Sequence, residues 1–245
     1  MQRHELLDAL RESAAVIAAV EPYDAEILSS LPRLRCISRC GVGTDAIDLE
    51  AARRLSISVL TTADEVVKPV AQMTVAMILA LARNLLQHYS DFRSGRWVKH
   101  TGFLLSEWTI GLVGFGRIGI AVEGLLRPFG ARVIVADPYI KPNGVPPGVK
   151  LMDLSKLLKM ADVVSIHAAR PLSEGPILGR KELAMMKPGS RVVNTARGHL
   201  LDESALRDAL ESGHIAAAAV DVFREEPYRG PLSGFPQVLG TPHVA

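Results

Sequence analysis

The chain has 245 residues, enough for a real core in one large or two modest domains. Its formal net charge is +2, with 28 basic and 26 acidic residues and no long basic run, so we expect no nucleic-acid partner. Hydrophobic residues make up 48% of the chain, but the apolar stretches are interrupted before membrane-spanning length, so we expect no membrane partner either.

The beginning of the chain predicts a cytoplasmic protein. Residues 1–8 are too polar for a secretory signal. Cys36 and Cys40 flank a short run that is typical of a strand. We interpret them as reduced, buried thiols, because a metal site would need further ligands. No metal is therefore expected.

Residues 1–68 predict a small unit in which helices and strands alternate, which favours a parallel sheet. Asp48 is expected to cap the third helix. A glycine turn, Gly41-Val-Gly-Thr-Asp45, follows the second strand. The expected helices are 4–12, 24–30 and 48–55, and the expected strands are 15–20, 34–38 and 58–61.

A long linking helix over about 69–89 is predicted by apolar residues at helical spacing, from Val70 to Leu85. We interpret this stripe as core rather than as a cofactor site. Residues 90–107 are expected to be irregular. Their Arg96-Trp97 loop is a candidate subunit contact, and we expect a homodimer.

Residues 109–137 carry the most informative pattern. A short apolar strand over 110–113 leads into Gly114, Gly116 and Gly119, spaced as G-x-G-x-x-G, and a helix is expected over 118–129. Gly114 permits the tight turn, Gly116 lets a pyrophosphate approach the backbone, and Gly119 lets helix and strand pack closely. The helix start favours the negative charge of the pyrophosphate.

Asp137 ends the second predicted strand, 132–136. Its carboxylate can accept hydrogen bonds from the adenosine ribose hydroxyls and would repel a 2′-phosphate, which favours NAD over NADP as the cofactor. Strand, glycines, helix, strand and acid in register argue against a glycine turn without a ligand.

Six strands are expected from residue 109 onward, the number in a doubly wound dinucleotide domain. Residues 69–245 are therefore predicted to be an NAD-binding Rossmann domain, and the fold class to be α/β with a second, smaller and incomplete α/β domain over 1–68. After residue 137 the expected helices are 153–160, 181–186 and 202–211, and the expected strands are 163–167, 191–195, 215–222 and 238–239.

Polar residues at the carboxyl ends of these strands are the candidate site, because ligands of open parallel sheets lie there. The guanidinium of Arg197 suits a substrate carboxylate. A carboxylate at Glu226 would stabilise the protonated form of His243, which suits an acid. Together with a nicotinamide they suit reduction of a 2-oxo acid. From the pattern alone, His167 fits a structural or cofactor-lining role better than an acid, and Glu226 before Pro227 also fits a solvated turn.

Five motifs in this order resemble the D-isomer-specific 2-hydroxyacid dehydrogenase family, the group that includes phosphoglycerate dehydrogenase and glyoxylate/hydroxypyruvate reductases. They occupy residues 38–49, 111–119, 186–198, 221–227 and 241–243. The resemblance implies an NAD-dependent oxidoreductase that acts on a small 2-oxo or 2-hydroxy acid.

The resemblance also implies the roles of particular residues. The catalytic residues would be Arg197, Glu226 and His243. The substrate carboxylate would meet Arg197 and an anion nest formed by Gly41, Val42 and Gly43. Asp221 would face the nicotinamide amide. The other expected cofactor contacts are Gly114, Gly116, Arg117, Ile118, Gly119, Asp137, His167, Ala168, Thr195 and Ala196.

The sequence departs from the family pattern at several places. Gln72-Met73 replaces the usual Glu-His or Glu-Leu, and Arg170-Pro171 follows His167 where the family usually carries Pro and Thr. The family begins with a strand before the first helix and continues past the Thr-Pro-His motif, so we expect a shortened member or a fragment that leans on a partner subunit.

The same family includes transcriptional corepressors that sense dinucleotide, so a non-catalytic NAD(H)-binding regulator is the alternative function. A different Rossmann enzyme would need Arg197 and His243 far apart.

Overall fold

The computed structural model describes residues 3–169 and 175–245; Arg170 and Pro171 lie outside the described residues. The chain divides into two compact units, Met1–Val67 and Lys68–Ala245. Each unit has a parallel sheet, as the alternation of strands and helices predicts.

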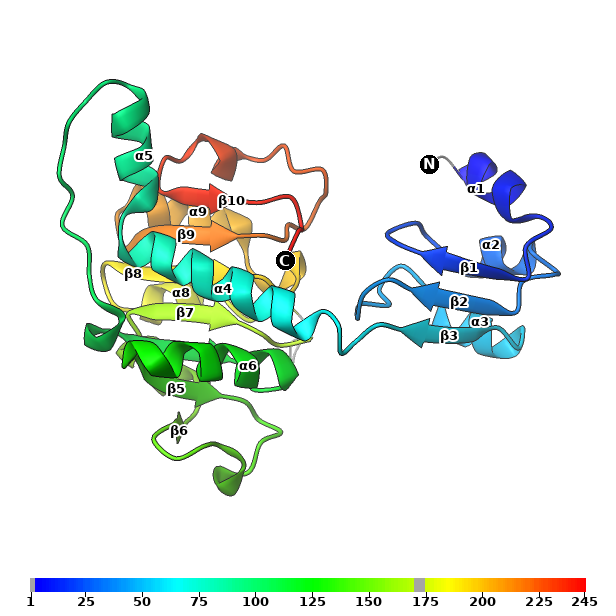
Figure 1. Ribbon diagram of the computed structural model, residues 1–245, viewed down its shortest axis with the longest axis horizontal. Helices are drawn as coiled ribbons and strands as arrows, with labels where there is room; N and C mark the ends of the chain where they lie inside the picture. Colours follow the sequence, from blue (N-terminus) through cyan, green and yellow to red (C-terminus); the bar gives the residue numbers. More distant parts are fainter. Residues whose placement is uncertain (1–2, 170–174) are drawn as a thin grey trace. The chain divides into compact units, whose positions relative to one another are not determined.

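The small unit is a three-stranded sheet in the order β1-β2-β3 (Figure 1). Its elements are α1 (Arg3–Leu10), β1 (Ala15–Ala18), α2 (Ala25–Ser29), β2 (Cys36–Arg39), α3 (Leu49–Arg54) and β3 (Ser58–Thr61). All three helices and all three strands contribute to one core cluster, which includes Leu6, Ile27, Ile37 and Ala52. The side chain of Asp48 accepts from the Ala51 amide, so the predicted cap of α3 is confirmed.

The large unit is a seven-stranded sheet in the order β10-β9-β8-β7-β4-β5-β6, with every neighbouring pair parallel. The order reverses direction at β4, as in a doubly wound sheet. Its strands are β4 (Thr109–Val113), β5 (Arg132–Ala136), β6 (Lys150–Leu151), β7 (Val163–Ile166), β8 (Ser190–Asn194), β9 (Ile215–Val220) and β10 (Val238–Gly240). Its α-helices are α4 (Val67–Ala82), α5 (Leu85–Arg93), α6 (Arg117–Leu126), α7 (Leu154–Met160), α8 (Arg180–Met185) and α9 (Glu203–Glu211).

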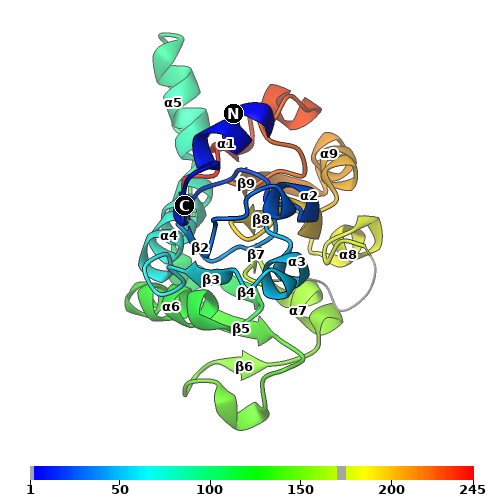
Figure 2. The ribbon, with the colours of Figure 1, turned by 90° about the vertical axis from the view of Figure 1, so that its right-hand side faces the viewer.

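Helices cover both faces of this sheet. Helices α4 and α6 lie on one side of the strands, and α7, α8 and α9 lie on the other (Figure 2). Two core clusters match these layers. One joins α4 and α6 to one face of the strands, and the other joins α7, α8 and α9 to the opposite face. Short 3-10 turns complete the unit at η1 (Leu105–Glu107), η2 (Arg127–Phe129), η3 (Pro142–Gly144), η4 (Gly198–Leu200) and η5 (Pro231–Gly234).

Three predictions about the elements are wrong. The single helix over 69–89 is two helices, because Asn84 takes a left-handed conformation with φ of +50° and its side-chain amide donates to the Thr101 carbonyl at 2.8 Å. The large sheet has seven strands rather than six, because β6 pairs with β5. The two cysteines are not buried as predicted, because Cys36 is half-buried and Cys40 is exposed. Among the described residues no single helix is long and apolar enough to cross a membrane, though α4 and α5 pass that test as a pair bent by 66°.

Candidate active site

The glycine turn after β4 has the geometry that its spacing predicts. Gly114 has φ of +94°, and a Cβ on it would lie 2.7 Å from the backbone of His167 and Ala168. A Cβ on Gly119 would lie 2.6 Å from the Gly114 carbonyl oxygen. Gly116 has no atom within 4 Å of its Cβ position, so the space beside the start of α6 is open. A ligand can therefore approach the backbone at Gly116, and Arg117 and Ile118 open the helix there.

Asp137 lies beside this turn. Its carboxylate accepts from the Phe115 amide at 2.8 Å and from the Tyr139 amide at 2.9 Å. The acid at the end of β5 is therefore fixed against the residue between the first two glycines of the motif.

His167, directly after β7, is neutral at pH 7. Its Nε2 lies 2.9 Å from the Ser165 hydroxyl, and its Nδ1 is out of contact with solvent and has no hydrogen-bond partner among the described residues. Burial lowers the pKa of His167 to about 4. A buried imidazole nitrogen without a hydrogen-bond partner, beside the glycine turn, suits a position at which a bound ligand supplies the missing hydrogen bond.

Arg197 lies at the carboxyl end of β8, just before η4. The side-chain amide of Asn194 donates to the Arg197 carbonyl at 2.9 Å, which fixes the backbone there. A Cβ on Gly198 would lie 2.0 Å from the Phe223 carbonyl carbon and 2.3 Å from the Arg224 nitrogen. Only a glycine lets these two segments touch, so Arg197 is brought directly beside the loop that begins at Phe223.

That loop carries the carboxylate of the site. One oxygen of Glu226 accepts from the Phe223 amide at 2.9 Å, and the other lies 2.9 Å from Nδ1 of His243. Both side chains are partly exposed, at 37% for Glu226 and 43% for His243. The loop is braced by Tyr228, whose ring stacks on Phe223 at 4.0 Å and whose hydroxyl accepts from the Leu232 amide.

Contacts therefore connect the segments that carry the three predicted catalytic residues, at the carboxyl ends of β8, β9 and β10. Arg197 and His243 are attached to one loop, 223–226, through Gly198 and Glu226.

Two residues that were predicted to contact the cofactor, Thr195 and Asp221, form hydrogen bonds with residues outside the predicted contacts. The Thr195 hydroxyl lies 2.9 Å from that of Thr74, which is fully buried on α4 and donates to the Val70 carbonyl. Asp221, also fully buried, accepts hydrogen bonds from Thr241 and from the Val244 and Ala245 amides. The Ala196 amide donates to the Asn194 side chain.

The predicted anion nest in the small unit is partly occupied by its own chain. Gly41 has φ of +133°, and its amide donates to the Thr62 hydroxyl at 2.8 Å. The guanidinium of Arg39 donates to the carbonyls of Cys40 and Gly43.

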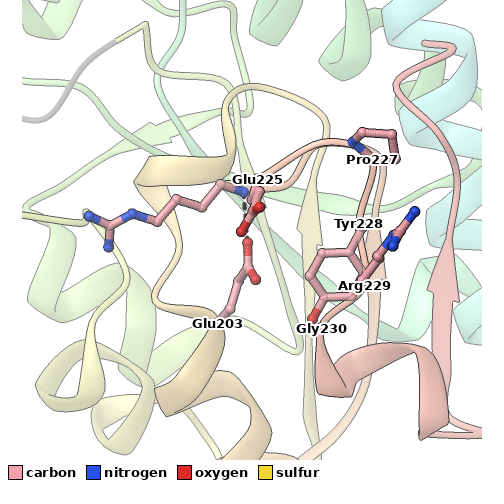
Figure 3. A pocket seen from close by; sticks show the side chains of 7 residues that line it. Glu203, Glu225, Pro227, Tyr228, Arg229 and Gly230 are labelled. Carbon is pink, nitrogen blue, oxygen red and sulfur yellow. Dashed lines mark hydrogen bonds between the residues drawn. The ribbon is translucent and has the colours of Figure 1, made fainter.

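A hollow of about 730 Å³ lies along the 223–230 loop. Its lining residues are Glu203, Arg224, Glu225, Pro227, Tyr228, Arg229 and Gly230. Figure 3 shows the carboxylates of Glu203 and Glu225 on one side and Tyr228 and Arg229 on the other. Arg197, Glu226 and His243 do not line it, so we do not assign it to the substrate. No cluster of three metal-binding side chains occurs within 3–169 and 175–245.

Comparison with known proteins identifies the family. Residues 75–245 match the model of the D-isomer specific 2-hydroxyacid dehydrogenase, NAD binding domain. The chain belongs to the D-isomer specific 2-hydroxyacid dehydrogenase family. The predicted resemblance and the α/β Rossmann fold class are therefore confirmed, and the family's domain is one that binds NAD.

Individual relatives agree with this family. The chain is 37% identical to a D-3-phosphoglycerate dehydrogenase of Mycobacterium leprae over 99% of its own length and 47% of the relative's. It is 35% identical to a glyoxylate reductase of Thermococcus litoralis, over 99% of this chain and 77% of the relative. The crystal structure of the TT0316 protein from Thermus thermophilus has a TM-score of 0.92 at 36% identity, over 100% of this chain and 79% of that one.

The chain thus spans about half the length of the phosphoglycerate dehydrogenase that it matches, 47%. Two features of the site were not predicted from the sequence, the hydrogen bond of Thr74 and the contact of Gly198 with the loop. Gly198 stands inside a recognised motif, but the loop that it contacts, at Phe223 and Arg224, comes from a later part of the chain.

Proposed function

We propose that this chain interconverts a small 2-oxo acid and its D-2-hydroxy acid with NAD as the cofactor. The observation that carries the proposal is the close packing of Gly198 on the 223–226 loop. Gly198 directly follows Arg197, and Glu226 of the same loop is paired with His243, which supports a site that contains all three residues. This combination suits binding of a 2-oxo acid and transfer of a proton to its carbonyl oxygen.

The residues around the glycine turn fit a dinucleotide. Gly116 leaves room for a pyrophosphate at the start of α6, where free amide groups favour negative charge. The Asp137 carboxylate suits ribose hydroxyls and disfavours a 2′-phosphate, which supports NAD over NADP. The unpaired Nδ1 of His167 can be satisfied by a bound cofactor. Bound NAD supplies or accepts the hydride.

Arg197 is proposed to bind the substrate carboxylate and polarise the adjacent carbonyl, because its planar fork matches a carboxylate. Its backbone is fixed by Asn194, which supports a defined position of the side chain. As negative charge develops on the carbonyl oxygen, the same cation stabilises it.

His243 is proposed to move the proton at its Nε2. An ionised carboxylate only accepts hydrogen bonds, so Nδ1 of His243 must carry a hydrogen toward Glu226. The other ring nitrogen, Nε2, then holds the proton that the forming alkoxide takes in reduction, and accepts the hydroxyl proton in oxidation. Glu226 fixes this tautomer and stabilises the protonated ring.

The experiment is NADH oxidation by the chain with glyoxylate, hydroxypyruvate and phosphohydroxypyruvate. We expect turnover with at least one of these acids, and loss of most of kcat/KM in Arg197→Ala. The matched control is Arg180→Ala, an exposed arginine that pairs with Asp208 and should leave the rate unchanged. Binding of NADH without turnover of any acid would contradict the proposal and select the regulator.

We also propose that a second copy of the chain covers α5 and the loop after it. Tyr89, Phe92 and Trp97 are 67%, 70% and 87% exposed. The loop that carries Trp97 is held in place, because the nearly buried Asp91 accepts from Arg96 and lies 2.6 Å from His100. Exposed aromatics on a fixed segment support a subunit contact.

Sedimentation of Trp97→Asp tests this contact. We expect a dimer for the unmodified chain and a monomer for the variant. Met160→Asp, which puts the same charge on an exposed apolar residue of α7, is the control and should stay dimeric. A monomer at every concentration of the unmodified chain would contradict the proposed dimer.

A further inference from the structure

Asp221, directly after β9, is bonded to the segment that carries His243. Its backbone carbonyl accepts from the His243 amide at 2.8 Å. We infer that Asp221 is a positioning residue, which acts on the reaction through His243 by clasping residues 241–245. The effect of Asp221 on the reaction rests on the proposed function. The clasp, the set of hydrogen bonds between Asp221 and residues 241–245, does not depend on that function.

The carboxylate of Asp221 is engaged from three directions. One oxygen accepts from the Thr241 hydroxyl and from the Val244 amide at 3.0 Å, and the other oxygen accepts from the Ala245 amide at 3.0 Å. The residue has no exposed surface. Charge-assisted hydrogen bonds in a buried place are about twice as strong as neutral ones, so this carboxylate orders the whole segment.

The clasp matters because His243 has a strained backbone. Its φ is +55°, in the left-handed region, which residues with a side chain rarely adopt. Such a conformation persists only where the surroundings determine it. Here the bonds to Asp221 lie on both sides of His243, from Thr241 before it and from Val244 and Ala245 after it. They hold the backbone that lets Nδ1 reach Glu226 at 2.9 Å.

This role differs from the cofactor contact that the family resemblance implies for Asp221. A contact with the nicotinamide amide needs a carboxylate that a ligand can reach. The structure instead gives this carboxylate three donors from its own chain and no exposed surface. The two roles predict different effects of the same substitution.

The test is Asp221→Asn in the chain and in a His243→Ala background. An asparagine keeps one acceptor oxygen but replaces the other with an NH₂ group, which faces a backbone N–H donor and cannot accept its hydrogen bond. We expect kcat to fall about 10–100-fold, as for a misplaced catalytic group, while the Kd of NADH from fluorescence changes less than about twofold. In the His243→Ala background we expect no further loss of kcat. A rise in the NADH Kd of about tenfold or more in both backgrounds, with an equal loss of kcat in each, would overturn the inference.

Amide hydrogen exchange of residues 243–245 keeps the test independent of turnover. Exchange should become faster in Asp221→Asn and, to a smaller extent, in Thr241→Val, which removes one clasp bond with little change of shape. Asp153→Asn, which alters the cap of α7, is the control and should leave these amides unchanged. If no acid is turned over, the proposed function fails while faster exchange still supports the clasp. Unchanged exchange in both variants would overturn the clasp even in an active enzyme.

Discussion

Replacing Gly198 with alanine should disable the site while leaving most of the fold intact. A Cβ at this position would lie 2.0 Å from the Phe223 carbonyl carbon and 2.1 Å from its oxygen. Ordinary contacts begin near 3.4 Å, so the loop must move by roughly 1.4 Å to make room. Both atoms belong to backbone, so no side chain can rotate away.

That displacement acts on the catalytic geometry, because Phe223 donates to Glu226 and Glu226 contacts His243. A misplacement of about 1 Å costs on the order of 10²-fold in rate, so kcat/KM for the preferred 2-oxo acid should fall by about that factor or more. Overpacking should also cost about 1–3 kcal/mol of stability. The NADH Kd should change little, because the glycine turn follows β4, which β7 separates from β8 in the sheet.

The assays are NADH oxidation, NADH fluorescence and urea unfolding, with Gly124→Ala as the control. Gly124 lies on α6 with nothing within 4 Å of its Cβ position. The same change there should leave activity intact and stabilise the helix by about 0.5–1 kcal/mol. Full activity and unchanged stability of Gly198→Ala would refute the close packing of Gly198 on the loop.

Three further predictions concern the cofactor side of the sheet. His167 has a folded-state pKa of about 4, below its unfolded value of about 6.5, so the unfolded chain binds more protons between these two pH values. The free energy of unfolding should therefore fall by about 2 kcal/mol from pH 7 to pH 5 in urea titrations, and His167→Asn should flatten this pH dependence. Asp137→Ala should lower the ratio of NADH to NADPH kcat/KM by about tenfold, since a hydrogen bond to a charged group is lost together with a repulsive charge; an unchanged ratio would remove Asp137 from cofactor choice. Thr74→Val should cost about 1–2 kcal/mol in urea unfolding, because the buried Thr195 hydroxyl loses its partner; equal stability would contradict that bond.

Much of the fold follows from short-range patterns in the sequence. The caps at Asp48, Asp153 and Asp202 each accept from a backbone amide three residues later, as expected for an aspartate that precedes an apolar helix. Gly114 and Gly119 have the roles that their spacing predicts, because strand, turn and helix are contiguous in the chain.

The errors arise where distant residues decide the structure. Apolar spacing continues past Ala82 into Leu85 and Leu86, so it cannot reveal that Asn84 bonds the carbonyl of Thr101 and ends α4. The two-residue strand β6 is too short for any pattern and exists because Lys150 and Leu151 pair with β5.

The candidate site divides in the same way. Residue types and family motifs predicted Arg197, Glu226 and His243, and the structure joins them through contacts that no pattern reveals. The clearance at Gly198 depends on Phe223, and the geometry of His243 depends on Asp221. The motifs therefore predict which residues form the site, whereas the contacts that hold these residues could be found only from coordinates.

The most direct test of the proposed chemistry is the single-turnover rate of NADH oxidation by the chain and by His243→Ala, with a 2-oxo acid in excess. His214→Ala serves as the control, because His214 precedes β9 at the opposite end of the strand from Asp221 and contacts the Leu183 carbonyl. We expect His243→Ala to lose about 10²–10⁴-fold in rate and to retain NADH binding, with His214→Ala close to the unmodified chain. An equal rate for His243→Ala, or NADH binding by the unmodified chain without oxidation of NADH by any 2-oxo acid, would contradict it.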